Sequence, residues 1–161
     1  MFIMLALAFC VSCNPFAPAA SQSSNSEQFG DPHTINGYFQ AFQYAYQFRD
    51  TTLYGNLLAD NFVFSFHDYD QGVDIQWGRD DEMQHTSGLF QNTEQLSLLW
   101  GDVIEAEGSP LDSTVTRAFS LDVTFNEADI EHVDGSAVFH LQRSSLTAPW
   151  LAVSWQDESS S

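Results

Sequence analysis

The chain has 161 residues, among them 22 acidic side chains, four arginines and no lysine, so its formal net charge is −18. A surface this acidic repels phosphate backbones, and the composition therefore predicts no nucleic-acid partner. Aromatic residues make up 14% of the chain, enough to build the core of one domain of ordinary size. The two cysteines, Cys10 and Cys13, stand close together near the start, so we expect no disulfide staple and no cysteine metal site in the domain.

The first thirteen residues are typical of an export signal. Residues 2–9 are all apolar, a run too short to span a bilayer, which takes about 20 apolar residues. Ser12 and Cys13 follow, and the segment resembles a bacterial lipoprotein signal in which Cys13 is the lipidated first residue of the mature protein. This resemblance implies an exported protein of the cell envelope, held to the membrane by lipid and facing the periplasm or the exterior. The alternatives are a plain secretory signal and a buried N-terminal segment.

One folded domain is expected after this signal. Residues 14–32 are rich in Pro, Ala, Ser, Gln and Asn, which is the composition of a flexible tether. Residues 33–158 contain the periodic apolar patterns and form the predicted domain.

The domain begins with two predicted helices. Apolar side chains recur at helical spacing over 35–49 and predict the first helix. A second, shorter helix is expected over 51–58, with Asp50 as its N-cap and its end at residues 60–61.

A third helix is predicted over 79–91. Carboxylates favour the positive end of a helix dipole, and the first turn carries three of them: Asp80, Asp81 and Glu82. The side chains expected to face the core are Met83, Thr86, Leu89 and Phe90.

The remaining patterns predict strands. Phe62, Phe64 and Phe66 alternate on one face of a strand over 62–68, which pairs as a hairpin with 73–77. Four further strands are expected over 95–107, 115–125, 137–141 and 150–156. In the first of these four, the residues expected along one face are Leu96, Leu98, Trp100 and Ile104. Helices followed by meandering strands predict an α+β fold with the helices on one face of an antiparallel sheet.

This order of elements over 34–157 resembles the nuclear transport factor 2-like superfamily, which includes ketosteroid isomerase and the SnoaL-like proteins. The segments that carry the resemblance are 44–50, 68–74, 77–79, 88–92 and 150–155. The resemblance implies a cone-shaped, curved antiparallel sheet packed on three N-terminal helices. It also implies a pocket at the open end of the cone, which members use for catalysis, ligand binding or dimer contacts.

The resemblance supplies weak catalytic candidates. Isomerase-type chemistry needs a carboxylate base and proton donors aimed at an oxyanion. Tyr46 or Tyr44 offers a hydroxyl from the first helix, and Asp68 offers a base at a strand end. The acid expected on the penultimate strand is missing, because residues 139–141 are Phe, His and Leu. The predicted ligand pocket is lined by Tyr46, Phe64, Trp77, Trp100, Arg117 and Phe119.

Arg117 is the third catalytic candidate. It interrupts an apolar strand face on the same side as Phe119 and Leu121. A charge there must be paired or must reach water. Two interpretations remain open: a salt bridge to one of the many acids, or a pocket group that orients an anionic or carbonyl ligand.

No metal and no cofactor are expected. Asp68, Asp70 and Asp74 are closely spaced, but an EF-hand loop needs glycine at its sixth position and glutamate at its twelfth. Counted from Asp68, Gly72 is fifth and Arg79 is twelfth, so a solvated turn is favoured over a calcium site. The five histidines have no zinc-type spacing.

Three functions remain open at this stage. The favoured one is a non-catalytic, lipid-anchored envelope protein that binds a small hydrophobic ligand or a protein partner. The second is a small cofactor-independent enzyme of isomerase, hydratase or cyclase type acting on a carbonyl substrate in the cone. The third is a structural module that forms a homodimer through its sheet face.

Overall fold

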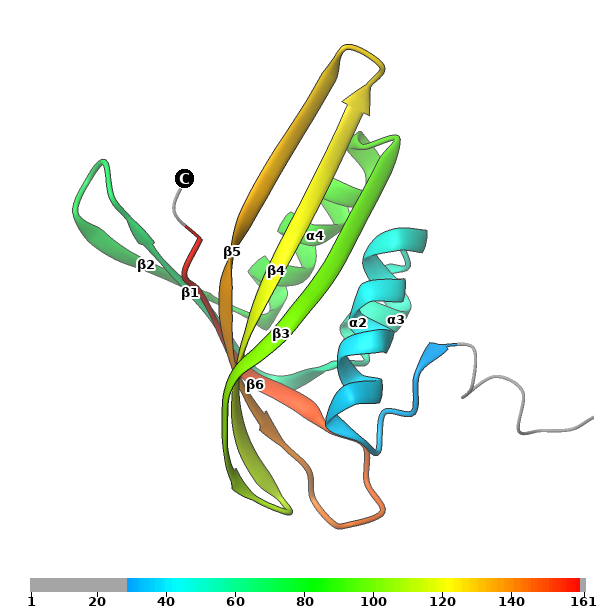
Figure 1. Ribbon diagram of the computed structural model, residues 1–161, viewed down its shortest axis with the longest axis vertical. Coiled ribbons are helices and arrows are strands. Elements are labelled where there is room, and N and C mark those ends of the chain that lie inside the picture. Colours follow the sequence, from blue (N-terminus) through cyan, green and yellow to red (C-terminus); the bar gives the residue numbers. More distant parts are fainter. Residues whose placement is uncertain (1–28, 160–161) are drawn as a thin grey trace, which may run out of the picture.

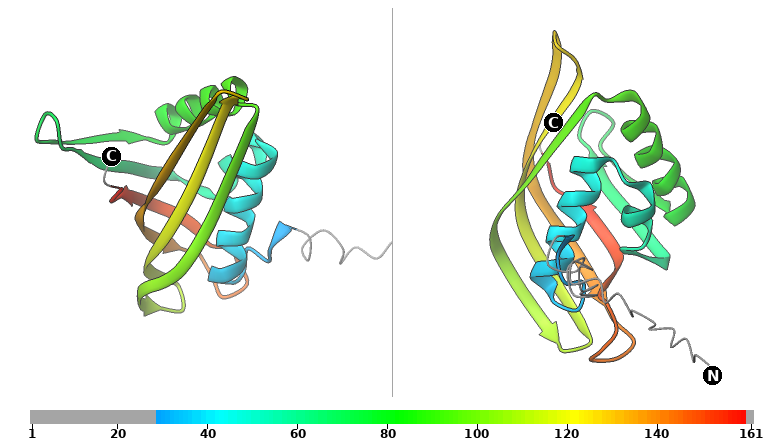
Figure 2. Two further views of the ribbon diagram at one scale, coloured as in Figure 1. Left: turned by 45° about the horizontal axis from the view of Figure 1, so that its top comes forward. Right: turned by 90° about the vertical axis from the view of Figure 1, so that its right-hand side faces the viewer.

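The computed structural model describes residues 29–159; the predicted export signal, Cys13 and most of the predicted tether lie outside them. Within this range, three helices lie on the inner side of one curved, six-stranded sheet that does not close on itself (Figure 1; Figure 2). The predicted α+β class is confirmed. No helix in the described part of the chain combines the length and the apolar character needed to cross a bilayer.

Helix α2 (Ile35–Phe48) forms where the apolar periodicity predicts it. Thr34 caps its start, and its hydroxyl accepts a hydrogen bond from the backbone N–H of Gly37 at 3.0 Å. Arg49 ends the helix in the left-handed conformation, with φ of 54°. Helix α2 lies on the concave side of the sheet (Figure 2), and its buried side chains belong to the same core cluster as those of the strands.

Helix α3 (Thr51–Gly55) has the predicted cap but is shorter than predicted. The Asp50 carboxylate accepts hydrogen bonds from the N–H groups of the first turn at 2.9 Å. The prediction that the helix reaches residue 58 is wrong, because Leu58 already pairs with Ala152 in the sheet. Residues 60–61 therefore lie inside a strand and do not stop the helix.

Helix α4 (Arg79–Asn92) matches its prediction within one residue. The sheet consists of β1 (Leu58–Asp68), β2 (Val73–Gly78), β3 (Gln95–Ser109), β4 (Asp112–Asn126), β5 (Asp129–Gln142) and β6 (Leu151–Asp157). Their order across the sheet is β2-β1-β6-β5-β4-β3. Strands β1 and β6 pair in parallel, whereas every other neighbouring pair is antiparallel. The sheet is therefore mixed, because the last strand inserts beside the first hairpin.

A break in register in β3 corrects one prediction. Leu96 and Leu98 are buried as expected. The pairing with β4 shifts after Trp100 and again after Val103, so the alternation of faces is interrupted. Ile104, predicted to share the inner face, is 63% exposed.

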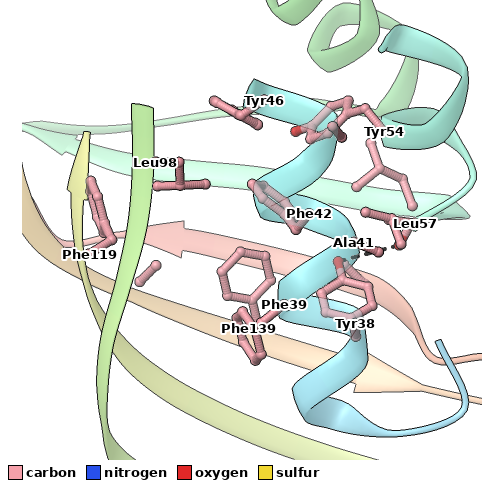
Figure 3. Packing of buried hydrophobic residues seen from close by; sticks show 14 of the residues in the cluster. Tyr38, Phe39, Ala41, Phe42, Tyr46, Tyr54, Leu57, Leu98, Phe119 and Phe139 are labelled. Carbon is pink, nitrogen blue, oxygen red and sulfur yellow. Dashed lines mark hydrogen bonds between the residues drawn. The ribbon is translucent and has the colours of Figure 1, made fainter. Parts of the chain in front are cut away.

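Aromatic rings fill the space between α2 and the sheet. Phe42 lies 5.6 Å from Phe139 of β5 and 5.5 Å from Trp100 of β3, both in edge-on geometry (Figure 3). Trp100 in turn lies 6.2 Å from Phe119 of β4, so helix and sheet enclose one continuous core. Phe139 also stacks on Trp155 of β6 at 5.4 Å.

The last residues of the predicted tether contact this domain. The ring of Phe29 meets Tyr44 of α2 edge-on at 5.7 Å, and Gly30 is buried. The carbonyl of Pro32 accepts a hydrogen bond from the N–H of Trp150 at 2.9 Å. Residues 29–32 therefore lie against α2 and the start of β6.

The four arginines all donate to main-chain carbonyl oxygens. These contacts are Arg49 to Thr93, Arg79 to Gly55 at 3.0 Å, Arg117 to Gly101 at 2.9 Å, and Arg143 to Pro110 at 2.6 Å. Among residues 29–159 no arginine forms an ion pair with a carboxylate, and each ion pair there joins a histidine to an aspartate. The arginines thus link segments of the fold, and their four positive charges still leave a net charge of −18.

The outer face of the sheet is polar where β4 meets β5. Asp122 lies opposite His132 and Ser120 lies opposite Asp134. The imidazole of His132 contacts Asp122 through Nδ1 at 2.5 Å and Asp134 through Nε2 at 2.9 Å. These hydrogen bonds, first to Asp122 and then to Asp134, raise the pKa of His132 above its ordinary value of 6.5. A homodimer through this sheet face stays a prediction.

Phe139 tests the aromatic core. We expect Phe139→Ala, at a fully buried position, to lower the free energy of unfolding by about 3–5 kcal/mol, because it removes a ring that several others enclose. Phe48→Ala is the control, since this side chain is 60% exposed and its removal should cost about 0.5 kcal/mol or less. Urea denaturation measures both, and equal losses would contradict the described core.

The histidine between two carboxylates predicts a pH dependence. Because folding raises the pKa of His132, its stabilising contribution is complete below the unfolded pKa of about 6.5 and is lost as pH rises through the folded pKa. An NMR titration of the imidazole should therefore give a midpoint above 6.5 in the folded protein. Asp122→Asn should lower that midpoint, whereas Asp31→Asn, which removes the partner of His33, should not.

Candidate functional site

A buried carboxyl group lies between α4 and the hairpin. Glu82, in the first turn of α4, is only 3% exposed. Its Oε1 accepts hydrogen bonds from the hydroxyls of Tyr54 at 2.5 Å and Thr86 at 2.9 Å. Its Oε2 accepts from Nε1 of Trp77 at 2.7 Å. Three neutral donors from α3, α4 and β2 thus converge on one carboxylate.

The same residue lines a small open cavity. The cavity has a volume of about 260 Å³ and is bounded by α2, α4 and strands β1, β2 and β6. Its lining residues are Tyr46, Phe64, Trp77, Glu82, His85, Thr86, Leu89 and Trp155. Mostly aromatic walls with few polar groups are the lining typical of a small-molecule site.

The aromatic walls hold one another at several angles. The ring of Phe64 stacks on Trp77 at 4.6 Å and meets Trp155 edge-on at 4.8 Å. His85, an exposed side chain of α4, meets the other side of Trp77 edge-on at 4.7 Å. These mutual contacts fix the ring orientations before any ligand enters.

Two tyrosines connect this cavity to the core. Tyr46 stacks on Phe42 at 5.1 Å and meets Tyr54 edge-on at 5.7 Å. Burial raises the pKa of Tyr46, and the charge of Glu82 raises it further. Burial is also the main cause that raises the pKa of Tyr54, with smaller effects from Tyr46 and Glu82. Both hydroxyls therefore stay protonated and act as neutral donors.

The predicted ligand pocket is divided by the structure. Tyr46, Phe64 and Trp77 line the cavity beside Glu82. The other three residues lie elsewhere: Trp100 and Arg117 contact Phe39, and Phe119 contacts Trp100. Trp100 contacts Phe39 at 5.0 Å and forms part of the wall between helix and sheet. Helix α2 and its aromatic side chains fill the space that the prediction left open.

Arg117 takes a third role that neither prediction described. Its Nε donates to the carbonyl of Gly101, and its guanidinium lies over the ring of Phe39 at 5.0 Å. Burial lowers its pKa, while the nearby charge of Asp102 acts in the opposite direction. Through the hydrogen bond to Gly101 and the contact with Phe39, Arg117 of β4 connects its own strand to β3 and to α2.

Asp68 holds the turn of the β1–β2 hairpin. Its carboxylate accepts hydrogen bonds from the backbone and the side-chain amide of Gln71, at 2.9 and 2.7 Å. Asp74 binds the ring of His67 at 2.7 Å. Asp68, Tyr46 and Arg117 thus lie on separate elements and share no cavity among residues 29–159. No cluster of three or more metal-ligating side chains occurs in that range.

Sequence reasoning missed Glu82, His85 and Trp155 as parts of the site. The signal for Glu82 was readable: it lies four residues before Thr86, and Phe90 lies another four beyond, so all three share one helical face. Because Thr86 and Phe90 were predicted to face inward, Glu82 had to face inward as well. Its position in the first turn suggested a surface charge instead.

The Glu82 site predicts a specific loss of stability. Glu82→Gln keeps the shape but replaces an acceptor with an amide donor, so one of the three donors loses its partner. We expect the free energy of unfolding to fall by about 1–3 kcal/mol. Glu105→Gln is the control at an exposed position of β3 and should change stability by about 0.5 kcal/mol or less. If the two variants unfold at the same urea concentration, the buried network is wrong.

No family model and no curated protein matches this sequence. Solved structures do match the fold. A proposed scytalone dehydratase from Novosphingobium aromaticivorans superposes with a TM-score of 0.68 at 11% identity, over 79% of this chain and 82% of that one. A proposed dehydratase of the nuclear transport factor 2-like family from Streptomyces avermitilis gives 0.63 at 16% identity, over 81% and 96%. A nuclear transport factor 2-like protein of unknown function in nutrient uptake, from Rhodospirillum rubrum, gives 0.63 at 15%, over 80% and 99%.

At these identities the similarity concerns the fold. It agrees with the curved open sheet, the helices on its inner side and the order of the elements. The chain therefore has the nuclear transport factor 2-like cone fold.

Proposed function

We propose that this domain binds a small, largely hydrophobic molecule in the cavity beside Glu82. The observation that carries the proposal is the lining of that cavity: aromatic rings enclose it and one buried carboxylate provides its polar centre. A few convergent polar groups in an apolar recess are the usual composition of a ligand site.

Binding fits the hydrogen bonds of Glu82 better than catalysis does. A general base must have an oxygen free to take a proton from the substrate. Most of the acceptor capacity of Glu82 is already occupied by Tyr54, Thr86 and Trp77. In this arrangement the carboxylate positions the wall of the cavity.

His85 favours one second candidate, a cofactor-independent enzyme of hydratase type. Its imidazole lines the cavity and has no hydrogen-bond partner within residues 29–159, so both ring nitrogens are available to a bound molecule. The proposed dehydratases that share the fold support this candidate by analogy alone. This candidate differs from simple binding because it predicts that the bound molecule is chemically converted.

We also propose that Cys13 carries the lipid that holds this domain outside the cytosol. The support is the sequence resemblance of residues 1–13 to lipoprotein signals. A single acyl chain gives only marginal membrane binding, so the modified cysteine needs more than one chain. The tether then places the cavity away from the bilayer surface.

Metabolic labelling with a fatty acid tests the anchor. We expect label on the full chain and on a Cys10→Ala variant, and none on Cys13→Ala, because only the residue at the processing site is acylated. Persistent label on Cys13→Ala would contradict the assignment.

Ligand-observed NMR with 3,3-dimethylbutan-1-ol, a neutral compact probe, tests the cavity. We expect saturation transfer from the protein to the tert-butyl group, because that group matches an aromatic recess of about 260 Å³. Leu89→Trp, which adds volume to the lining, should abolish the transfer. Leu99→Trp, at an exposed position of β3, is the control and should leave it unchanged. Transfer that survives in Leu89→Trp would place the binding elsewhere.

A further inference from the structure

The carboxylate of Glu82 is buried without a basic partner. None of the ion pairs among residues 29–159 includes it. The arginine closest in sequence, Arg79, donates instead to the carbonyl of Gly55 at 3.0 Å. Burying a charge is costly unless it is paired or hydrogen-bonded. The donors to Glu82 are two hydroxyls and an indole, all neutral, so no basic side chain lies within ion-pair distance of this carboxylate.

One acceptor position of this carboxylate stays open. A carboxylate has two oxygens and about four lone-pair sites. Tyr54 and Thr86 occupy Oε1, whereas Trp77 alone occupies Oε2. The open position therefore belongs to Oε2, beside the indole of Trp77, and it can take a hydrogen bond or an ionic contact from a ligand.

The rings around this carboxylate favour positive charge. The face of an aromatic ring carries negative potential and attracts a cation within about 6 Å of its centre. Phe64 contacts Trp77 at 4.6 Å and Trp155 at 4.8 Å, and all three rings line the same cavity. No lysine or arginine lines the cavity, so a bound anion would meet Glu82 without a basic partner.

The surrounding protein adds to this preference at longer range. The chain carries a net charge of −18, and its arginines are engaged with main-chain carbonyls. Such a field raises the local concentration of cations and lowers that of anions. Long-range attraction of this kind is screened by salt, whereas a contact inside the cavity is screened much less.

We propose that the cavity takes a small organic cation, a substituted amine or quaternary ammonium compound with an apolar body. Its charged head lies beside Oε2 of Glu82 and against the rings of Trp77 and Trp155. This inference rests on the proposed function and specifies its ligand class. The negative charge of Glu82 that attracts the cation repels ligands that carry a carboxylate or phosphate group.

Three probes of nearly equal shape test this inference. Choline, 3,3-dimethylbutan-1-ol and 3,3-dimethylbutanoate share a trimethyl head or its carbon equivalent but differ in charge: positive, neutral and negative. Dissociation constants measured by ligand-observed NMR at pH 8 should place choline on the order of tenfold tighter than the alcohol. The anion should bind more weakly than the alcohol. Raising the salt concentration to 0.5 M, about three times the physiological value, should reduce but not remove the preference for choline.

Two variants separate the local charge from the charge of the whole surface. Glu82→Gln should reduce the preference for choline over the alcohol from about tenfold to about twofold, because the buried charge is gone and only the attraction of the rings remains. Glu105→Gln removes the same single charge from exposed β3 and should leave the tenfold ratio in place. Circular dichroism checks that each variant is folded. The comparison of the three probes on the unaltered protein does not depend on these variants.

The outcomes distinguish the two proposals. If the alcohol binds the cavity as tightly as choline or more tightly, the cationic ligand class is wrong and the proposed binding function stands. If none of the three probes binds, both proposals fail. If Glu105→Gln abolishes the preference as Glu82→Gln does, the preference comes from the surface field, and the assignment to Glu82 is overturned.

Discussion

The structure depends on the ring of Phe42 in the middle of α2. It meets Tyr54 of α3, Phe139 of β5 and Trp155 of β6 edge-on, between 5.3 and 5.6 Å. It also stacks on Tyr46 of its own helix. A single buried side chain thus fixes the distance and angle between the helix, its neighbour and the centre of the sheet (Figure 3). The curvature of the sheet follows, because the strands bend around a helix surface made of large rings.

The polar site is the edge of this aromatic core. Tyr46 and Tyr54 have one side against Phe42 and direct their hydroxyl ends toward the region of Glu82. The carboxylate then ties Tyr54 to Trp77 of the hairpin, so α3, α4 and β2 are joined by hydrogen bonds where ring packing ends. The cavity exists because a charged group and its donors cannot be packed as tightly as the interior beyond them. The end of the aromatic core therefore determines both where the site lies and which polar groups line it.

Most elements could be predicted from the sequence, because α2 and β4 have apolar periods of their own and α4 has acidic side chains in its first turn. Ile104 was misplaced, since a register break is a property of two paired strands and cannot be read from one. Of the residues predicted to line a pocket, Tyr46 and Trp77 line the cavity, whereas periodicity shows only that Trp100 and Phe119 face inward. Whether an inward side chain meets a cavity or another ring depends on the helix packed against it. Glu82 is the opposite case, because its helical spacing was informative and its chemistry pointed to the surface.

The binding of every arginine to main-chain oxygen has a consequence for the solvent. In a typical protein, basic side chains neutralise part of the acidic surface from within. Here the four arginines offset only a small part of the 22 acidic charges and lysine is absent, so dissolved ions balance the remaining net charge of −18. Mobile counterions therefore accumulate around the folded chain. Dilution of the electrolyte removes that layer, and the acidic strands then repel one another.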